Sequence, residues 1–186
     1  MNKFLKLFAF LAVVFVGMSL VSCDDDEPET ENEEEEITTL SLALVGGAAP
    51  VVFQFRDLDG DGGNPPVITQ GTPLAANTTY TGILTLLNEN ENEDITAEIL
   101  EEDEDHQFFF RPSNGLNLSV SYKDADADQN PIGLETEFRT GAVSTGTLVV
   151  TLRHLPNKTA AGVKDGNINN AGGETDIEVT FNVTIQ

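Results

Sequence analysis

The feature that most constrains the fold is the alternation of apolar and polar residues, which recurs along the chain. It is clearest near the C-terminus, where five apolar residues from Ile177 to Ile185 are each separated by one polar residue. Successive side chains of a β-strand point to opposite faces of a sheet, so this spacing predicts a strand with one buried and one solvated face. The same reasoning predicts strands over 40–44, 51–55, 80–86, 116–122 and 148–152, and shorter strands around 108–110 and 135–140.

These strands predict an all-β fold class. Roughly eight strands separated by Gly-, Asn- and Asp-rich turns are typical of a single antiparallel β-sandwich, immunoglobulin-like or jelly-roll-like. Residues 94–103 break the alternation: Ile95 and Ile99 are four apart and Asp94 is placed to cap, which predicts one short helix. No linker divides residues 37–186, and 39% hydrophobic residues suffice for one core. We therefore expect one β-sandwich domain over 37–186.

The N-terminal segment has the features of a targeting signal. Lys3 and Lys6 precede a short apolar run, and small residues follow it, which predicts a signal peptide over 1–22. The sequence Leu-Val-Ser-Cys ending at Cys23 resembles the lipobox of bacterial lipoproteins, and Cys23 is the only cysteine in the chain. The resemblance implies lipidation of Cys23 and a membrane anchor built from its acyl chains. An ordinary signal peptide with a chance cysteine is the alternative.

The next residues are strongly acidic. Residues 24–36 hold ten acids and no base, so this stretch has little to bury, and together with Cys23 it predicts a disordered tether over 23–36. An acidic stretch directly after the lipidated cysteine resembles the surface-export signal of Bacteroidota lipoproteins. That resemblance implies a lipoprotein of the outer membrane facing the cell surface, with the periplasmic face as the alternative.

The rest of the chain resembles a group of small Bacteroidota lipoproteins. The stretches that carry the resemblance are EDITAEILEEDEDHQFFF and the ending GGETDIEVTFNVTIQ. Such sequences often carry the label "type 1 periplasmic binding fold superfamily". That label implies two α/β lobes and about twice this length, which the strand pattern does not support. The resemblance implies the compartment and transfers no site residue.

Charge and cysteine content exclude several classes of function. The chain has 32 acids against 9 bases, a formal net charge of -23. Nucleic-acid binding and a polybasic membrane patch both need clusters of Lys and Arg, which are missing here. A single cysteine excludes an intrachain disulfide and a four-cysteine zinc site.

Two loops alternate carboxylates with the spacing of calcium ligands. The candidate ligands are Asp57, Asp59, Asp61 and Asn64 in the first loop, and Asp124, Asp126, Asp128, Asn130 and Glu135 in the second. Neither loop is an EF-hand, because Ile68 takes the closing position of the first and Gln129 the glycine position of the second. They predict looser calcium loops of an extracellular β-domain. The alternative is that Asp, Gly and Asn simply form hairpin turns.

The two histidines, His106 and His154, form a second candidate site. His154 continues the alternation of 148–152 and should face inward at the end of that strand, while His106 precedes the aromatic run 108–110. One hypothesis is that they meet and, with Glu104 or Asp105, bind zinc or another divalent ion. Ligation of haem iron is a further possibility. The alternative is a hydrogen-bonded strand-end His154 and a solvated His106, which their wide separation in sequence favours.

Catalytic signals are weak. The chain has no nucleophile elbow, no H-E-x-x-H and no phosphate loop, so we expect no enzyme and assign no catalytic residue. The sequence favours a cell-surface lipoprotein that acts as a non-enzymatic binding or accessory module, associated with an outer-membrane uptake receptor. One alternative is a structural or adhesive surface module stabilised by calcium. A third interpretation is a hydrolase that uses His106, His154 and a carboxylate to hold a metal.

Overall fold

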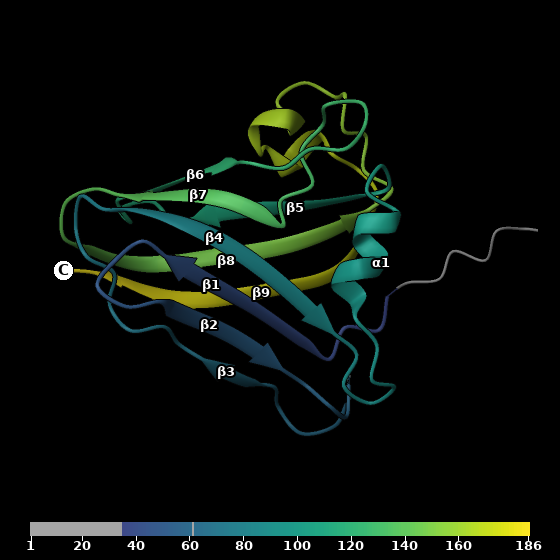
Figure 1. The fold of residues 1–186 in the computed structure, drawn as a ribbon, viewed down its shortest axis with the longest axis horizontal. Coiled ribbons are helices and arrows are strands. Elements are labelled where there is room, and N and C mark those ends of the chain that lie inside the picture. The colour runs from purple at the N-terminus through teal and green to yellow at the C-terminus, as the bar shows by residue number, and fades with distance from the viewer. Residues whose placement is uncertain (1–34, 61) are drawn as a thin grey trace, which may run out of the picture. The chain divides into compact units, whose positions relative to one another are not determined.

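Two antiparallel sheets make up the part of the chain that the computed structural model describes, residues 35–60 and 62–186 (Figure 1). The larger sheet has the strand order β3-β2-β1-β4-β7-β6 and the smaller one β5-β8-β9. The strands of the larger sheet are β1 Thr39–Val45, β2 Val51–Arg56, β3 Val67–Thr69, β4 Thr79–Leu87, β6 Leu118–Tyr122 and β7 Glu135–Thr140. Those of the smaller sheet are β5 His106–Pro112, β8 Ser144–His154 and β9 Glu174–Ile185.

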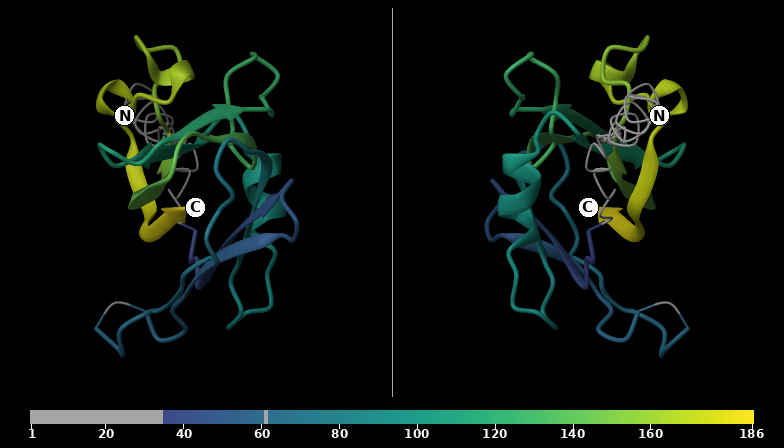
Figure 2. Two further views of the ribbon diagram at one scale, coloured as in Figure 1. Left: turned by 90° about the vertical axis from the view of Figure 1, so that its left-hand side faces the viewer. Right: turned by 90° about the vertical axis from the view of Figure 1, so that its right-hand side faces the viewer.

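The two sheets pack face to face, as the edge-on views of Figure 2 show. Aromatic rings contact each other across the interface near both edges of the larger sheet. Phe53 of β2 lies 5.5 Å from Phe181 of β9 between ring centroids, and Phe110 of β5 meets Phe138 of β7 edge-on at the same distance. The predicted antiparallel β-sandwich is therefore confirmed.

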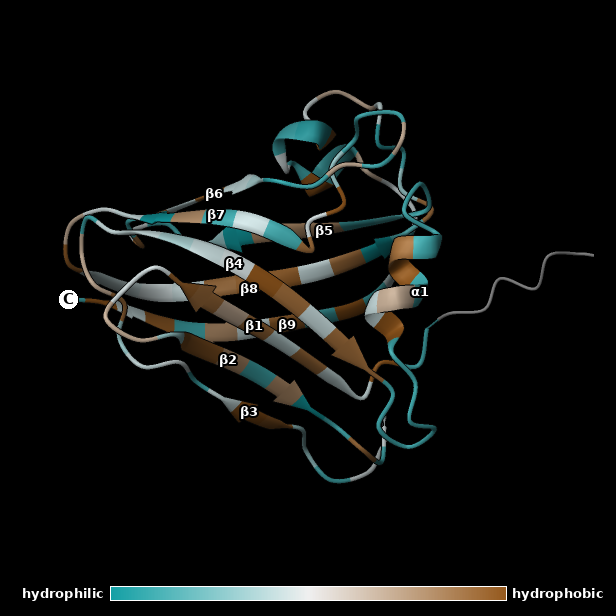
Figure 3. Cartoon of the chain, in the orientation of Figure 1, coloured by the Kyte–Doolittle hydropathy of each residue, from teal (hydrophilic) through white to brown (hydrophobic). Residues whose placement is uncertain are grey.

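The alternation in the sequence becomes the core of this sandwich. Figure 3 shows it as bands of hydrophobic and hydrophilic residues along strands such as β8. Leu148, Val150 and Leu152 of β8 are fully buried, and the apolar residues of β9 face them from the neighbouring strand. Each such side chain contributes about 1.5–3 kcal/mol when it is fully buried.

The predicted helix is present as α1, Ile95–Glu101, with Ile95 and Ile99 buried against the core. Its expected cap is wrong in one respect. Asp94 is the N-cap residue, but its side chain makes no cap hydrogen bond. Its backbone carbonyl accepts from the N–H groups of Ala97 and Glu98 instead. None of the described helices is long and apolar enough to cross a membrane.

Some predicted features fall outside the described residues. These are the signal peptide, the lipidation residue Cys23, the acidic segment up to residue 34, and the candidate calcium ligand Asp61. The described chain begins at Glu35, whose side chain contacts His106, and the His106 ring in turn contacts the carbonyl of Glu102 just after α1. Between β8 and β9 a long loop carries two single turns of 3-10 helix, η1 Val163–Asp165 and η2 Ile168–Asn170.

Candidate metal centre at the ends of strands β5 and β8

His106 and His154 lie side by side in the structure. His106 begins β5 and His154 ends β8, and the register of this antiparallel pair sets them directly opposite each other. Their rings stack with centroids 4.7 Å apart and an interplanar angle of 19°. His106 is 0% exposed and is not a solvated loop residue. The two imidazoles thus meet, as the metal hypothesis required.

The carboxylate that joins them is Glu35, not Glu104 or Asp105. Glu35 Oε1 lies 2.6 Å from His106 Nε2, and the Glu35 side chain is only 6% exposed. Glu104 and Asp105 are exposed on the connection that leads into β5. Asp105 contributes its backbone carbonyl, which accepts from the N–H of Leu155 and closes the end of the β5–β8 pair.

The three side chains form a cluster of metal-ligand type. One ligand atom from each of Glu35, His106 and His154 lies within 4.8 Å of the other two. Glu35 belongs to the acidic stretch that the sequence assigned to a tether. One glutamate among ten neighbouring acids carries no signal of its own, so sequence reasoning could not select it.

The backbone fixes the orientation of the His106 ring. Its Nδ1 lies 3.1 Å from the carbonyl oxygen of Glu102, just after α1. A carbonyl only accepts hydrogen bonds, so Nδ1 carries the proton and Nε2 faces Glu35. Histidines that bind metals commonly donate their second ring N–H to a backbone carbonyl in this way. The residue that follows α1 therefore fixes the His106 ring with its Nε2 toward Glu35.

Electrostatics favour a charged pair between Glu35 and His106. Burial opposes ionisation of both groups, but their mutual attraction outweighs it, lowering the pKa of Glu35 and raising the pKa of His106. The Glu102 carbonyl and Asp176 also raise the pKa of His106. Glu35 Oε1 and His106 Nε2 form this ion pair at 2.6 Å, and both side chains are buried.

Three ligand-type atoms in the cluster have no hydrogen-bond partner among the described residues. They are Nδ1 of His154, Oε2 of Glu35 and Nε2 of His106, which has only its ion-pair contact with Glu35, and all three are buried. Leaving a buried polar atom unsatisfied costs about 1–3 kcal/mol, so native proteins rarely do so without a water molecule, an ion or a functional reason. A bound cation would satisfy these atoms.

The donor set fits zinc better than calcium or haem. Zinc binds imidazole nitrogen and carboxylate oxygen at about 2.0–2.2 Å, which places tetrahedral ligand atoms about 3.3 Å apart. The cluster spans 2.6 to 4.8 Å, so small side-chain movements would suffice. Calcium prefers oxygen ligands alone. Two imidazoles that ligate one haem approach the iron from opposite faces, whereas these rings stack.

The first acidic loop forms a hydrogen-bonded turn. Asp57 Oδ1 accepts from the backbone N–H groups of Asp59 and Gly60 at 3.3 and 3.1 Å. Asp59 Oδ2 accepts from the backbone and side-chain nitrogens of Asn64 at 2.9 and 2.7 Å, and these bonds lower the pKa of Asp59. Asn64 thus points its N–H groups, not its carbonyl oxygen, at this carboxylate. Calcium binding here stays a prediction.

The second acidic loop already holds a positive charge. The Nζ of Lys158 lies 3.0 Å from Asp126 Oδ2, and both side chains are buried. Asp126 Oδ1 also accepts from the backbone N–H of Asn130 at 2.8 Å. Asp124 accepts from the backbone N–H groups of Gly133 and Glu135 at 2.8 and 2.7 Å.

The remaining candidates of this loop stand apart from that pair. The side chains of Asp128 and Glu135 are exposed, and the structure does not gather them with Asp126 into one cluster. An internal ammonium takes the place that the sequence assigned to calcium at Asp126. Calcium binding by this loop likewise stays a prediction.

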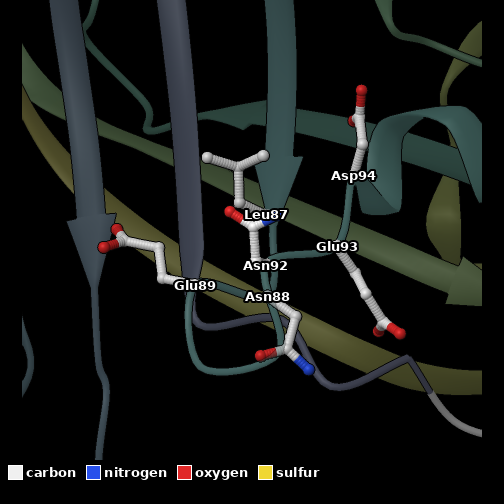
Figure 4. Close-up of a pocket in the computed structure, with 6 residues that line it drawn as sticks. All are labelled: Leu87, Asn88, Glu89, Asn92, Glu93 and Asp94. Atoms are coloured by element: carbon white, nitrogen blue, oxygen red, sulfur yellow. The ribbon is translucent and has the colours of Figure 1, made fainter.

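Two shallow hollows on the described surface are lined by residues other than the histidines. The hollow of about 270 Å³ in Figure 4 lies at the end of β4 and is lined by Leu87, Asn88, Glu89, Asn92, Glu93 and Asp94. Glu89 points toward β2, where Arg56 binds it at 2.6 Å. A second hollow of about 490 Å³ lies beside Tyr122. Polar residues predominate among those that line the first hollow, whereas the second is lined by a mixture of polar and apolar residues.

No family model, curated protein or solved structure gives a significant match to this chain. Its function is therefore inferred from the chemistry of its own residues, of which Glu35, His106 and His154 form the best-defined cluster.

Proposed function

We propose that this protein is a lipid-anchored, non-enzymatic module of the cell surface that binds one divalent transition metal ion through Glu35, His106 and His154. Zinc is the best fit. The observation that carries the proposal is the buried Nδ1 of His154, which has no hydrogen-bond partner among the described residues. The ring that carries this nitrogen stacks on His106. A metal ion held between these side chains gives that atom a role.

The choice of a transition metal follows from the ligands. Imidazole nitrogen suits zinc, copper and nickel, whereas calcium and magnesium select oxygen. The Glu102 carbonyl orients His106, and its position opposite His154 in the β5–β8 register brings the second imidazole into place. The cluster is therefore largely organised before the ion arrives.

Enclosure of the cluster supports binding in preference to catalysis. A catalytic zinc keeps one coordination position open to water or substrate. Here His106 is fully buried, His154 is 8% exposed and the Glu35 side chain 6% exposed. Such a site favours holding an ion over presenting it to a substrate, which argues against the metal-dependent hydrolase.

The cellular setting rests on the sequence. The lipobox ending at Cys23 supports a lipid anchor, and the acidic residues after it support export to the outer face of the outer membrane. A surface module of this kind would act beside a membrane protein such as an uptake receptor. Cys23→Ser should abolish labelling by a fatty acid, and added protease should digest the wild-type protein on intact cells. Protection on intact cells would favour the periplasmic face.

The metal proposal is tested by titrating the mature protein with Zn²⁺ and measuring heat and bound metal. We expect one ion per chain, and an affinity at least about tenfold weaker in His154→Ala. Glu104→Ala and Asp105→Ala are matched controls, because both remove an exposed acid beside His106 and should leave binding unchanged. Circular dichroism checks that His154→Ala is folded. Failure of the wild-type protein to take up stoichiometric zinc would refute the proposal.

A further inference from the structure

We infer that the metal ion fastens the junction between the lipid-anchored segment and the β-sandwich, an inference that rests on the metal-binding function proposed above. Two ligands, His106 and His154, belong to paired strands of the small sheet. The third, Glu35, is the first described residue and lies on the chain that leads from Cys23 into the fold. An ion bound by all three joins that chain to the sandwich.

The contacts around this junction show where the fastening acts. The hydrogen bonds that hold the start of β1 begin at Thr38, whose backbone N–H donates to the carbonyl of Leu87 at 3.0 Å. The hydroxyl of Thr38 accepts from the backbone N–H of Glu89 at 2.8 Å. Thr38 is therefore firmly attached to the turn after β4.

Between Glu35 and Thr38, two side chains contact the rest of the described chain. Ile37 is half-buried against the core, and Glu36 is exposed. Glu35 is held by its 2.6 Å contact with His106. Residues 35–37 therefore stay docked to the extent that the Glu35 carboxylate stays beside the two imidazoles.

Linkage connects the ion to this docking. Only the docked segment supplies the carboxylate ligand, so zinc binds the docked state more tightly than the undocked state. The same coupling must act in reverse, and bound zinc must increase the docked population. At 100 times its dissociation constant, an ion that requires Glu35 shifts this equilibrium by about 100-fold. Metal occupancy thereby determines how much of the time residues 35–37 are docked on the sandwich.

The consequence is protection of the anchor junction. A cut between Cys23 and Thr38 would separate the sandwich from its lipid anchor. With zinc bound, the peptide bonds after Glu35 and Glu36 lie next to a fixed ligand and should resist proteases, which need an extended and mobile substrate. We expect a surface lipoprotein of this design to be retained when the metal is present and released more readily when it is scarce.

The test is digestion of the mature, lipidated protein in detergent with a glutamate-specific protease, with Zn²⁺ or with EDTA. Mass spectrometry measures the rate of cleavage between Glu36 and Ile37. Zn²⁺ should slow this cleavage at least about tenfold. Cleavage after Glu91, in the exposed turn before α1, should not change, and it reports any direct effect of zinc on the protease.

Two variants separate the outcomes. Glu35→Gln removes the charged ligand from the junction and should lose the protection of the Glu36–Ile37 bond, while Glu104→Gln should keep it. Zinc uptake is measured in the same samples. If the wild-type protein binds zinc without any protection, or if Glu35→Gln stays protected, the fastening is refuted and the metal site stands. If the wild-type protein binds no zinc, the proposed function itself fails.

Discussion

Lys158 is a single residue whose removal should destabilise the whole domain. Its ammonium contacts the Asp126 carboxylate and the backbone carbonyl of Asp103, and both charged side chains are buried. Lys158→Ala leaves the Asp126 charge buried without its partner. We expect the free energy of unfolding, measured with urea, to fall by about 3–5 kcal/mol, the usual result of breaking one side of a buried pair.

Two control variants test whether the loss of stability in Lys158→Ala comes from the broken charge pair. Lys164→Ala removes an exposed lysine from the same loop and should change stability by no more than about 0.5 kcal/mol. The double variant Lys158→Met, Asp126→Asn removes both charges and should recover part of the loss. A double variant as unstable as Lys158→Ala would show that the charge pair is not the cause.

Glu89 gives a pH-dependent prediction at the same scale. Arg56 donates to both of its carboxylate oxygens, at 2.6 and 2.8 Å, and Thr39 donates a further hydrogen bond. These bonds lower the pKa of Glu89 to about 2. A carboxyl with a depressed pKa stabilises the fold above its ordinary pKa of 4.5, and this contribution is lost as pH falls toward 2.

Arg56→Met removes the main cause of that shift. We expect the pKa of Glu89, followed by carbon NMR of its carboxyl group, to rise most of the way to 4.5. The Thr39 bond keeps it slightly lower. Arg111→Met, a change of an exposed arginine on β5, is the control and should leave the Glu89 titration in place. An unchanged Glu89 titration in Arg56→Met would contradict the assignment.

At the scale of strands, Gly82 shows how one position couples the two sheets. It lies on the buried face of β4, and a Cβ added there would come 2.6 Å from the Phe138 ring and 2.5 Å from Thr136 Oγ1. Phe138 in turn packs edge-on against Phe110 of the other sheet. We expect Gly82→Ala to push the Phe138 ring out of place and to cost about 1–3 kcal/mol in urea unfolding.

A double-mutant cycle identifies the cause. In a Phe138→Leu background the ring is gone, so Gly82→Ala should cost clearly less than in the wild-type protein. An equal cost in both backgrounds would place the strain at Thr136 or in the backbone of β4, and not at the aromatic ring.

The strands also show which parts of the fold the sequence could predict. Alternation identified the long strands because each buries one face, as the pattern of β9 illustrates. It could not identify β3, since Val67, Ile68 and Thr69 are all exposed on an edge strand. Alternation also contains no information on strand order. His106 and His154 meet because β5 pairs with β8, and that pairing appears only in the folded chain.

At the scale of the whole molecule, the net charge of -23 makes repulsion between like charges the main long-range electrostatic effect on stability. Among the described residues, acids gather in the turn before α1 and in the connection after it. Mutual repulsion of this kind destabilises a compact state and weakens as salt shortens the Debye length from about 30 Å at 0.01 M to about 10 Å at 0.1 M. We expect the midpoint of thermal unfolding to rise with NaCl over this range. A midpoint independent of salt would contradict a dominant role for repulsion.

Specific ion binding must be separated from this general screening, and matched salts do so. Asp126 is already paired with Lys158, and Asp59 accepts two hydrogen bonds from Asn64. If both loops are only turns, CaCl₂ should raise the midpoint no further than MgCl₂ at the same ionic strength. A larger rise with calcium that disappears in Asp59→Ala would establish the first loop as a calcium site.

Zinc at 100 times its dissociation constant should instead add about 2.7 kcal/mol to the free energy of unfolding, at concentrations too low to screen charge. That gain should fall by about half or more in His154→Ala, because His106 and His154 are the only histidines in the chain and the variant removes one of them.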